Sequence, residues 1–402
     1  MKYLHSPIVP TGLPQLEAEL IPQLDINHNY LSEKIEAQQD NFLPFDQWMH
    51  QTLYAPNIGY YSGGSTKFGS GLPVGDFTTA PELTPLFGQS LAVQIHQVLS
   101  LSQSVEVLEF GAGSGTLAKA IIPALLDLGI DVQYSILEVS PSLKQRQQES
   151  LHQFGERVRW LDQLPTDFVG CAIANEVLDA MPVHLIERET AGVFSELGVS
   201  LATQPTVSPF TWAAQAANDA LARVAEARFP KVDGYRSEIN LQAEAWVREI
   251  GSWLSKGAVL LFDYGFPQHE YYHEQRAEGT LMCHFRHYAH SEALLFPGLQ
   301  DITAHVDFTA MADAALEGGL DVMGYTSQAR FLMNSGLVQR LEQLAPAGND
   351  SAETARWAQT ASAVQKLFSE AEMGELFKVL AVAKEIDGPL IGFLSGDRRD
   401  RL

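Results

Sequence analysis

The feature that most constrains this chain is an apolar run at 105–110 followed by three alternating glycines, Gly111, Gly113 and Gly115. A helical pattern begins directly after the third glycine, so the segment predicts a strand, a tight turn and a helix. Glycines lack a Cβ, so the backbone can bend sharply and approach a ligand closely. The first turn of the helix directs free N–H groups toward anything held in the turn.

Two classes of nucleotide site use a turn of this kind. The dinucleotide fingerprint Gly-x-Gly-x-x-Gly needs a glycine where this chain has Thr116, so that match fails. The observed Gly-x-Gly-x-Gly follows Glu109, an acid at the end of the strand, and this order is typical of S-adenosylmethionine (SAM) methyltransferases with a Rossmann-like sheet. An ordinary strand–helix turn without a ligand is the alternative at this point.

A second apolar run, 132–137, also ends in an acid, Glu138, roughly twenty residues beyond the glycine turn. A carboxylate at that place can accept hydrogen bonds from both ribose hydroxyls of a nucleoside. Ser140 and Pro141 then supply a good cap and a good first residue for a helix. The second acid favours a nucleoside site over a solvated strand end.

The composition limits the class of protein. The chain has 402 residues, 46% of them hydrophobic, and a formal net charge of -23, which disfavours nucleic acid as a partner. The N-terminus resembles neither a secretory signal nor a transit peptide, and no apolar run has the length of a membrane span, so a cytoplasmic bacterial protein is expected. Two cysteines make no disulfide framework or zinc motif, and the spacing of His284, His287 and His290 does not indicate a metal site, so no metal is expected.

The order of elements predicts an α/β fold, with a Rossmann-like sheet of the class I SAM-methyltransferase type and helices on both faces. Residues 1–100 are expected to form an N-terminal helical region with a long loop at 59–82. The methyltransferase domain is expected over 101–402, with substrate-binding insertions at about 184–235 and 266–300. Core strands are predicted near 105–110, 133–138, 157–161, 170–175 and 257–263, with helices at 116–127, 141–153 and 238–255 and closing strands at 320–327 and 377–383.

Candidate catalytic groups follow the fourth predicted strand, which ends in Asn175 and Glu176, with Asp179 three residues later. Paired carboxylates could orient a guanidinium and localise its charge for methyl transfer, although Asn and Asp at such a junction often only cap a helix. His305 could act as a general base, or as a structural histidine held by the backbone.

Taken together, these segments resemble the MidA-like SAM-dependent methyltransferases, whose mitochondrial members are protein arginine methyltransferases that assist assembly of respiratory complex I. The resemblance runs from about Pro44 to Lys384. Its characteristic segments are 53–61, 75–82, 109–115, 175–182, 262–265, 279–281 and 301–308.

The resemblance implies SAM as cofactor, with Glu138 and the three glycines binding it and Glu109 and Asn175 beside it. It also implies that the loop 75–82, including Asp76, Pro81 and Glu82, folds over the cofactor. A protein substrate methylated on arginine is the leading expectation; methylation of a small molecule or another side chain, or an assembly factor that uses SAM structurally, are the alternatives. The oligomeric state stays open, a homodimer included.

Overall fold

The computed structural model describes residues 8–62, 79–203, 208–348, 350–370 and 372–402. The chain divides into two compact units, each built from three segments. Unit 1 comprises residues 1–77, 179–243 and 268–305, and unit 2 comprises residues 78–178, 244–267 and 306–402. The expected insertion at about 184–235 and nearly all of that at about 266–300 fall in unit 1, whereas the expected N-terminal region 1–100 is divided, with residues 79–100 in unit 2. Among the described residues, no helix is both long and apolar enough to cross a bilayer.

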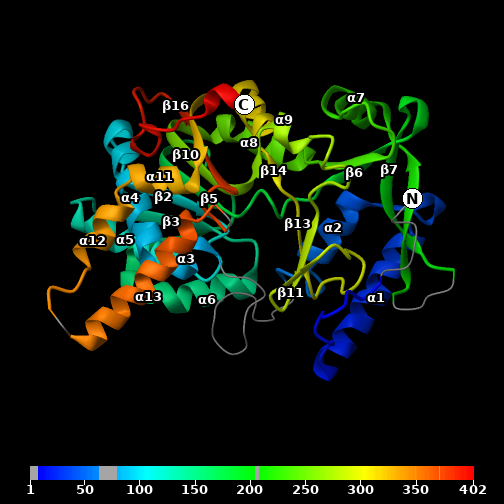
Figure 1. Ribbon diagram of the computed structural model, residues 1–402, viewed down its shortest axis with the longest axis horizontal. Helices are drawn as coiled ribbons and strands as arrows, with labels where there is room; N and C mark the ends of the chain where they lie inside the picture. Colours follow the sequence, from blue (N-terminus) through cyan, green and yellow to red (C-terminus); the bar gives the residue numbers. More distant parts are fainter. Residues whose placement is uncertain (1–7, 63–78, 204–207, 349, 371) are drawn as a thin grey trace. The chain divides into compact units, whose positions relative to one another are not determined.

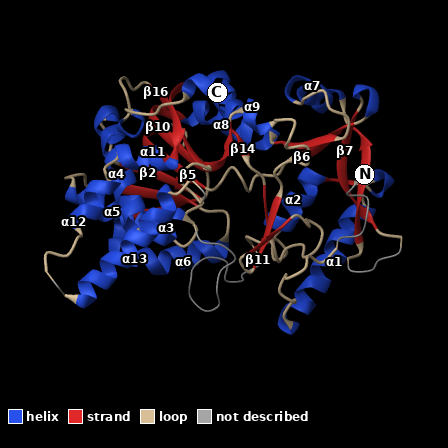
Figure 2. Ribbon diagram, viewed as in Figure 1, coloured by secondary structure: helices blue, strands red, loops and turns tan. Residues whose placement is uncertain are grey.

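Unit 2 is built on a mixed sheet (red strands in Figure 2). Its path runs through β15 (Asp321–Ser327), β16 (Phe377–Lys384), β10 (Leu254–Phe266), β5 (Phe168–Asn175), β2 (Glu106–Phe110), β3 (Gln133–Leu137) and β4 (Val158–Leu161), and β14 (Val306–Asp307) pairs with β10. The five strands from β10 to β4 are parallel, and β16 is antiparallel to both β10 and β15. This arrangement confirms the predicted fold class.

Helices cover both faces of this sheet, which explains why its strands are nearly continuous apolar runs. On one face, Phe87 of α4 (Pro85–Ser102) meets Phe262 of β10 with ring centroids 5.7 Å apart. On the other, Phe110 of β2 packs against Trp246 of α8 (Leu241–Trp253), with ring centroids 5.0 Å apart. Unit 2 also contains α3 (Ala80–Leu83), α5 (Thr116–Asp127), α6 (Pro141–Leu151), α10 (Phe308–Glu317), α11 (Gln328–Asn334), α12 (Leu337–Gln343) and α13 (Ser351–Phe368), all of which except α10 are labelled in Figure 1.

Unit 1 contains two antiparallel sheets. The larger has the order β1 (Leu43–Pro44), β7 (Phe194–Leu201), β6 (His184–Arg188) and β9 (Tyr235–Ile239), with β8 (Phe210–Ala216) on β7. The smaller has β12 (Tyr288–His290), β11 (Met282–Phe285) and β13 (Asp301–Thr303). Its helices are α1 (Ile21–Glu36), α2 (Phe45–Tyr54), α7 (Asp219–Arg228) and α9 (Gln268–Tyr271).

All three segments of unit 1 contribute residues to its apolar core. Trp48 of α2 meets Phe210 of β8 at 4.8 Å, and its indole N–H donates to the carbonyl of Ala293 at 3.4 Å. The insertion expected at about 184–235 supplies the antiparallel strands β6, β7 and β8. The predicted helix 238–255 begins only at Leu241 because residues 235–239 pair with β6 as β9.

Candidate functional site

The switch point of the unit 2 sheet lies between β2 and β5. From β2 the chain proceeds to β3 and β4 on one side, and it then returns to β5 on the other side of β2. Open α/β sheets bind ligands at the carboxyl ends of the strands at such a point. The glycine turn follows β2 and Asn175 ends β5, so two of the predicted site segments flank this point.

All three glycines of the turn have left-handed backbone. Their φ angles are +60° at Gly111, +53° at Gly113 and +81° at Gly115, a region that L side chains adopt at a cost of about 1–2 kcal/mol. A Cβ added to Gly115 would lie 2.9 Å from the Ser150 hydroxyl. Helix α5 begins at Thr116, directly after the turn, so its free N–H groups border the switch point.

Glu82, in α3, contacts the glycine turn. Its carboxylate accepts hydrogen bonds from the hydroxyls of Ser114 at 2.5 Å and Thr116 at 3.3 Å. Pro81 beside it is buried. Glu82 and Pro81 are therefore placed against the turn, where a contact with a bound nucleoside remains a prediction, and Asp76 lies outside the described residues.

Glu138 stands one residue beyond β3 and is held by two donors. One carboxylate oxygen accepts from the Ser140 N–H at 2.9 Å, and the other accepts from Gln147 Nε2 at 2.8 Å. Burial raises the pKa of Glu138, and these two hydrogen bonds oppose that rise. The same Gln147 amide donates to the carbonyl of Gly113 at 3.0 Å, so it ties Glu138 to the turn. A carboxylate has about four lone-pair sites, which leaves acceptor capacity for a ribose diol.

The sequence argument missed Gln147. Its side chain is fully buried on α6, and its Oε1 accepts from the Trp160 indole at 2.9 Å. A glutamine in a strongly polar helix carries no pattern that marks it as buried.

Glu109 is buried inside unit 2, with 3% of its surface exposed. Its Oε2 accepts a hydrogen bond of 2.7 Å from the Tyr134 hydroxyl on the neighbouring strand β3. Burial raises the pKa of Glu109 to about 7; the Tyr134 hydrogen bond works against this rise, and the charge of Glu138 adds to it. Glu109 is thus a carboxyl group that can carry or release a proton near neutral pH, beside the glycine turn.

Asn175 and Glu176 occupy the carboxyl end of β5. The Asn175 amide donates to Glu176 Oε1 at 3.2 Å, while Asn175 Oδ1 is buried and has no hydrogen-bond partner among the described residues. Glu176 has a left-handed φ of +54°, and its N–H donates to the carbonyl of Phe262 on β10 at 2.9 Å. A strained non-glycine residue next to an unsatisfied polar atom is typical of a functional position.

These groups fit a nucleoside that carries a cationic or amino substituent. The turn allows close backbone approach, Glu138 suits a ribose diol, and the buried Asn175 oxygen needs a donor that the described protein atoms do not supply.

Asp179 and His305 both belong to unit 1, whereas Glu176 belongs to unit 2. Asp179 is buried, and its carbonyl accepts from the N–H of Ala304, the residue before His305, at 3.0 Å. The His305 N–H donates to the Thr280 hydroxyl at 3.0 Å. The structure therefore brings two of the three predicted catalytic residues onto adjacent segments, and their catalytic roles remain predictions.

Two tyrosines that the sequence argument did not assign join this part of unit 1. Tyr54 donates to the carbonyl of Ala180 at 2.8 Å and stacks on Tyr61 with centroids 5.5 Å apart. Tyr61 donates to Asp301 Oδ1 at 3.0 Å. Burial raises the pKa of Tyr61, and the charges of Asp301 and Asp179 add to the rise. Aromatic rings and carboxylates therefore gather beside Asp179.

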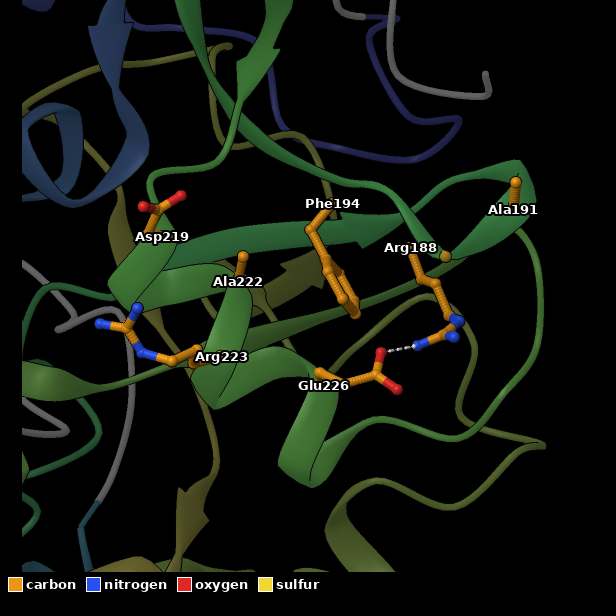
Figure 3. Close-up of a pocket in the computed structure, with 8 residues that line it drawn as sticks. Arg188, Ala191, Phe194, Asp219, Ala222, Arg223 and Glu226 are labelled. Atoms are coloured by element: carbon orange, nitrogen blue, oxygen red, sulfur yellow. Dashed lines mark hydrogen bonds and ion pairs between the residues drawn. The ribbon is translucent and has the colours of Figure 1, made fainter.

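A separate surface hollow of about 550 Å³ lies in unit 1 and contains none of the predicted site residues (Figure 3). Arg188 in this hollow donates to Glu226 Oε2 at 2.7 Å and lies over the ring of Phe194 at 5.2 Å. The guanidinium of Arg188 is therefore already paired with a carboxylate.

Comparisons with known proteins indicate the same class of cofactor. A family profile described as "Putative S-adenosyl-L-methionine-dependent methyltransferase" matches residues 87–326. A crystal structure from Burkholderia thailandensis, bound to S-adenosyl-homocysteine, has a TM-score of 0.91 and 44% identity over 97% of this chain and 100% of that chain. A second, native structure from the same organism has a TM-score of 0.87 and 43% identity over the same shares.

The curated relatives are less similar in sequence to this chain than the two crystal structures are. The protein arginine methyltransferase NDUFAF7 homolog of Drosophila melanogaster, a mitochondrial protein, is 26% identical over 95% of this chain and 94% of its own length. The corresponding protein of Rattus norvegicus is 28% identical over 84% of this chain and 80% of its own length. The chain therefore belongs to the MidA-like family of SAM-dependent methyltransferases, and SAM is its cofactor.

Proposed function

We propose that this enzyme transfers the methyl group of SAM to arginine side chains of a protein substrate. The observation that carries the proposal is Glu176, a strained residue fixed at the carboxyl end of β5, on the strand beside the glycine turn. The curated relatives that carry the name protein arginine methyltransferase support it.

A guanidinium is a poor nucleophile because its charge is delocalised over three nitrogens. A carboxylate that binds it in a forked geometry orients one nitrogen and draws the positive charge away from it. Bound SAM supplies a methyl group on a positively charged sulfur. We assign Glu176 to hold the guanidinium, so that one nitrogen forms the new C–N bond and gives up a proton as the C–S electrons remain on sulfur.

The acidic and aromatic group in unit 1 is suited to a peptide that presents arginine. Asp179 and Asp301 are buried carboxylates, and Tyr54 and Tyr61 form a stacked pair next to them. Arginine stacks on aromatic faces and pairs with carboxylates, so this group can recognise the residue or its neighbours. Asp179 or His305 would then accept the proton that the guanidinium loses.

The test uses SAM with a deuterated methyl group, the purified enzyme and a protein extract from cells that lack it. Total hydrolysis followed by mass spectrometry identifies the methylated amino acid. We expect labelled methylarginine with wild type, at least a 100-fold loss with Glu176→Gln, and little change with Glu149→Gln, which alters an exposed acid on α6.

SAM affinity is measured for the same variants. Label on another amino acid or on a small molecule would overturn the arginine assignment while leaving a methyltransferase. SAM binding without label in any fraction would favour a client-binding assembly factor. Loss of SAM binding in Glu176→Gln would show that Glu176 binds the cofactor rather than the substrate.

A further inference from the structure

Three side chains in unit 1 bring potential metal ligands to one point. They come from three elements: Asp46 from the first turn of α2, His184 from the start of β6, and Glu196 from β7. His184 Nδ1 lies 2.8 Å from Glu196 Oε1 and 3.7 Å from Asp46 Oδ1. One ligand atom from each residue lies within 4.8 Å of the other two.

The strand pairings explain how this cluster forms. β6 and β7 are antiparallel neighbours, with Ile186 opposite Glu196, so His184 and Glu196 lie diagonally across the ladder. β1 pairs with the far end of β7 and leads directly into α2, which brings Asp46 to the same strand.

The three side chains supply no fixed positive charge, because an imidazole is neutral unless it is protonated. With a neutral imidazole, the two carboxylates carry two negative charges, and Asp46 Oδ1 is buried without a hydrogen-bond partner among the described residues. Burial raises the pKa of Asp46, although His184 opposes the rise. Burial alone would lower the pKa of His184, but the hydrogen bond to Glu196 and the charge of Asp46 raise it overall. The site therefore attracts a cation.

We infer that Asp46, His184 and Glu196 bind a divalent transition-metal ion of the zinc or manganese type. Mixed imidazole and carboxylate ligands suit these ions. With metal–ligand distances near 2.1 Å, two ligands of a tetrahedral ion are roughly 3.4 Å apart, and the observed separations of 2.8 Å and 3.7 Å bracket that value. Three protein ligands leave one position for water.

The ion would join α2 to the β6–β7 pair and so stabilise unit 1, whose segments are far apart in sequence. All three ligands belong to unit 1, whereas the glycine turn and Glu138 belong to unit 2, so none of the three is a predicted SAM-binding residue. The competing occupant is a proton, which would convert His184 into an imidazolium shared between the two acids.

The test uses the full chain after removal of bound metal with EDTA. Zinc and manganese ions are titrated by calorimetry at pH 7.5, and bound metal is counted by elemental analysis after dialysis. We expect one ion per chain, at least a 100-fold loss of affinity in His184→Gln, and a metal-dependent rise in Tm that this variant lacks. The matched control is His269→Gln, which alters an exposed histidine 3.7 Å from Glu270.

If His184→Gln fails to fold, Asp46→Asn tests the same site while it keeps the His184–Glu196 hydrogen bond. The inference is overturned if wild type retains less than about one tenth of an equivalent, or if the variants bind as tightly as wild type. It is equally overturned if the NMR signal of His184 still titrates with a raised pKa at saturating metal, because the proton would then be the occupant.

Discussion

The buried carboxyl group of Glu109 should make the stability of this enzyme fall as the pH rises from mildly acidic to mildly basic. Its pKa is raised by burial from 4.5 to about 7 in the folded chain. The folded state therefore holds a proton that the unfolded state has released between these values. Unfolding free energy then decreases with rising pH across this window, because the unfolded state binds fewer protons.

The magnitude follows from the two pKa values. Relative to the fully protonated group, ionisation of Glu109 lowers the unfolding free energy by roughly 0.8 kcal/mol at pH 5 and roughly 3.3 kcal/mol at pH 8. The difference, about 2.5 kcal/mol, is absent in Glu109→Gln, since an amide does not titrate. Only 3% of Glu109 is exposed, so solvent does little to screen the effect.

The assay is urea denaturation of wild type and Glu109→Gln at half-unit intervals from pH 5 to pH 8. Other groups titrate in both proteins, so the unfolding free energy of Glu109→Gln is subtracted from that of wild type at each pH. The change in this difference from pH 5 to pH 8 is compared with the expected value of about 2.5 kcal/mol. Glutamine can still accept the Tyr134 hydrogen bond, so packing is conserved. A second variant, Tyr134→Phe, removes that hydrogen bond and should move the pH dependence to higher pH. Parallel curves for wild type and Glu109→Gln would refute a raised pKa for this residue.

Three further changes test other parts of the chain. Gly113→Ala should weaken SAM binding at least tenfold in calorimetric titration, whereas Gly129→Ala should leave it unchanged, because both glycines have a positive φ but Gly129 lies beyond the end of α5 rather than in the glycine turn. Glu138→Ala should weaken SAM binding by roughly 10- to 100-fold through loss of the ribose contacts, and unchanged binding would remove Glu138 from the cofactor site. Glu238→Ala should lower the unfolding free energy by roughly 3–5 kcal/mol in urea denaturation, because this buried carboxylate accepts from two backbone N–H groups and three hydroxyls; a loss below about 1 kcal/mol would contradict that account.

Local patterns predicted the switch-point edge of unit 2 well. The glycine turn needs positive φ angles at fixed positions, and only glycine adopts them readily. The positions of the glycines in the sequence therefore predict the backbone conformation of the turn. The helix after Glu138 is also local: Ser140 accepts from the Leu143 N–H at 3.4 Å and Pro141 is the first residue, as predicted. The parallel strands are buried on both faces, which makes them recognisable as apolar runs.

Features that depend on tertiary contacts could not be found in this way. Gln147 joins Glu138 to the turn only because α6 packs there, and Tyr61 reaches Asp301 across 240 positions of sequence. The helix predicted at 238–255 included part of β9, because those residues pair with β6 rather than continue the helical period. The His184 cluster likewise depends on strand register, so the sequence argument, which considered only the histidines at 284–290 and rejected them by their spacing, did not find it.

The position of β16 has a consequence for biosynthesis. This strand, Phe377–Lys384, is inserted between β10 and β15, so the sheet of unit 2 lacks an interior member until the ribosome has added residues 377–384. Until then, the edges of β10 and β15 present unpaired backbone groups, which are the usual starting points for aggregation. The strand of this sheet that comes latest in the described sequence therefore completes the sheet, and a nascent chain that stalls before residue 377 should depend on chaperones to remain soluble.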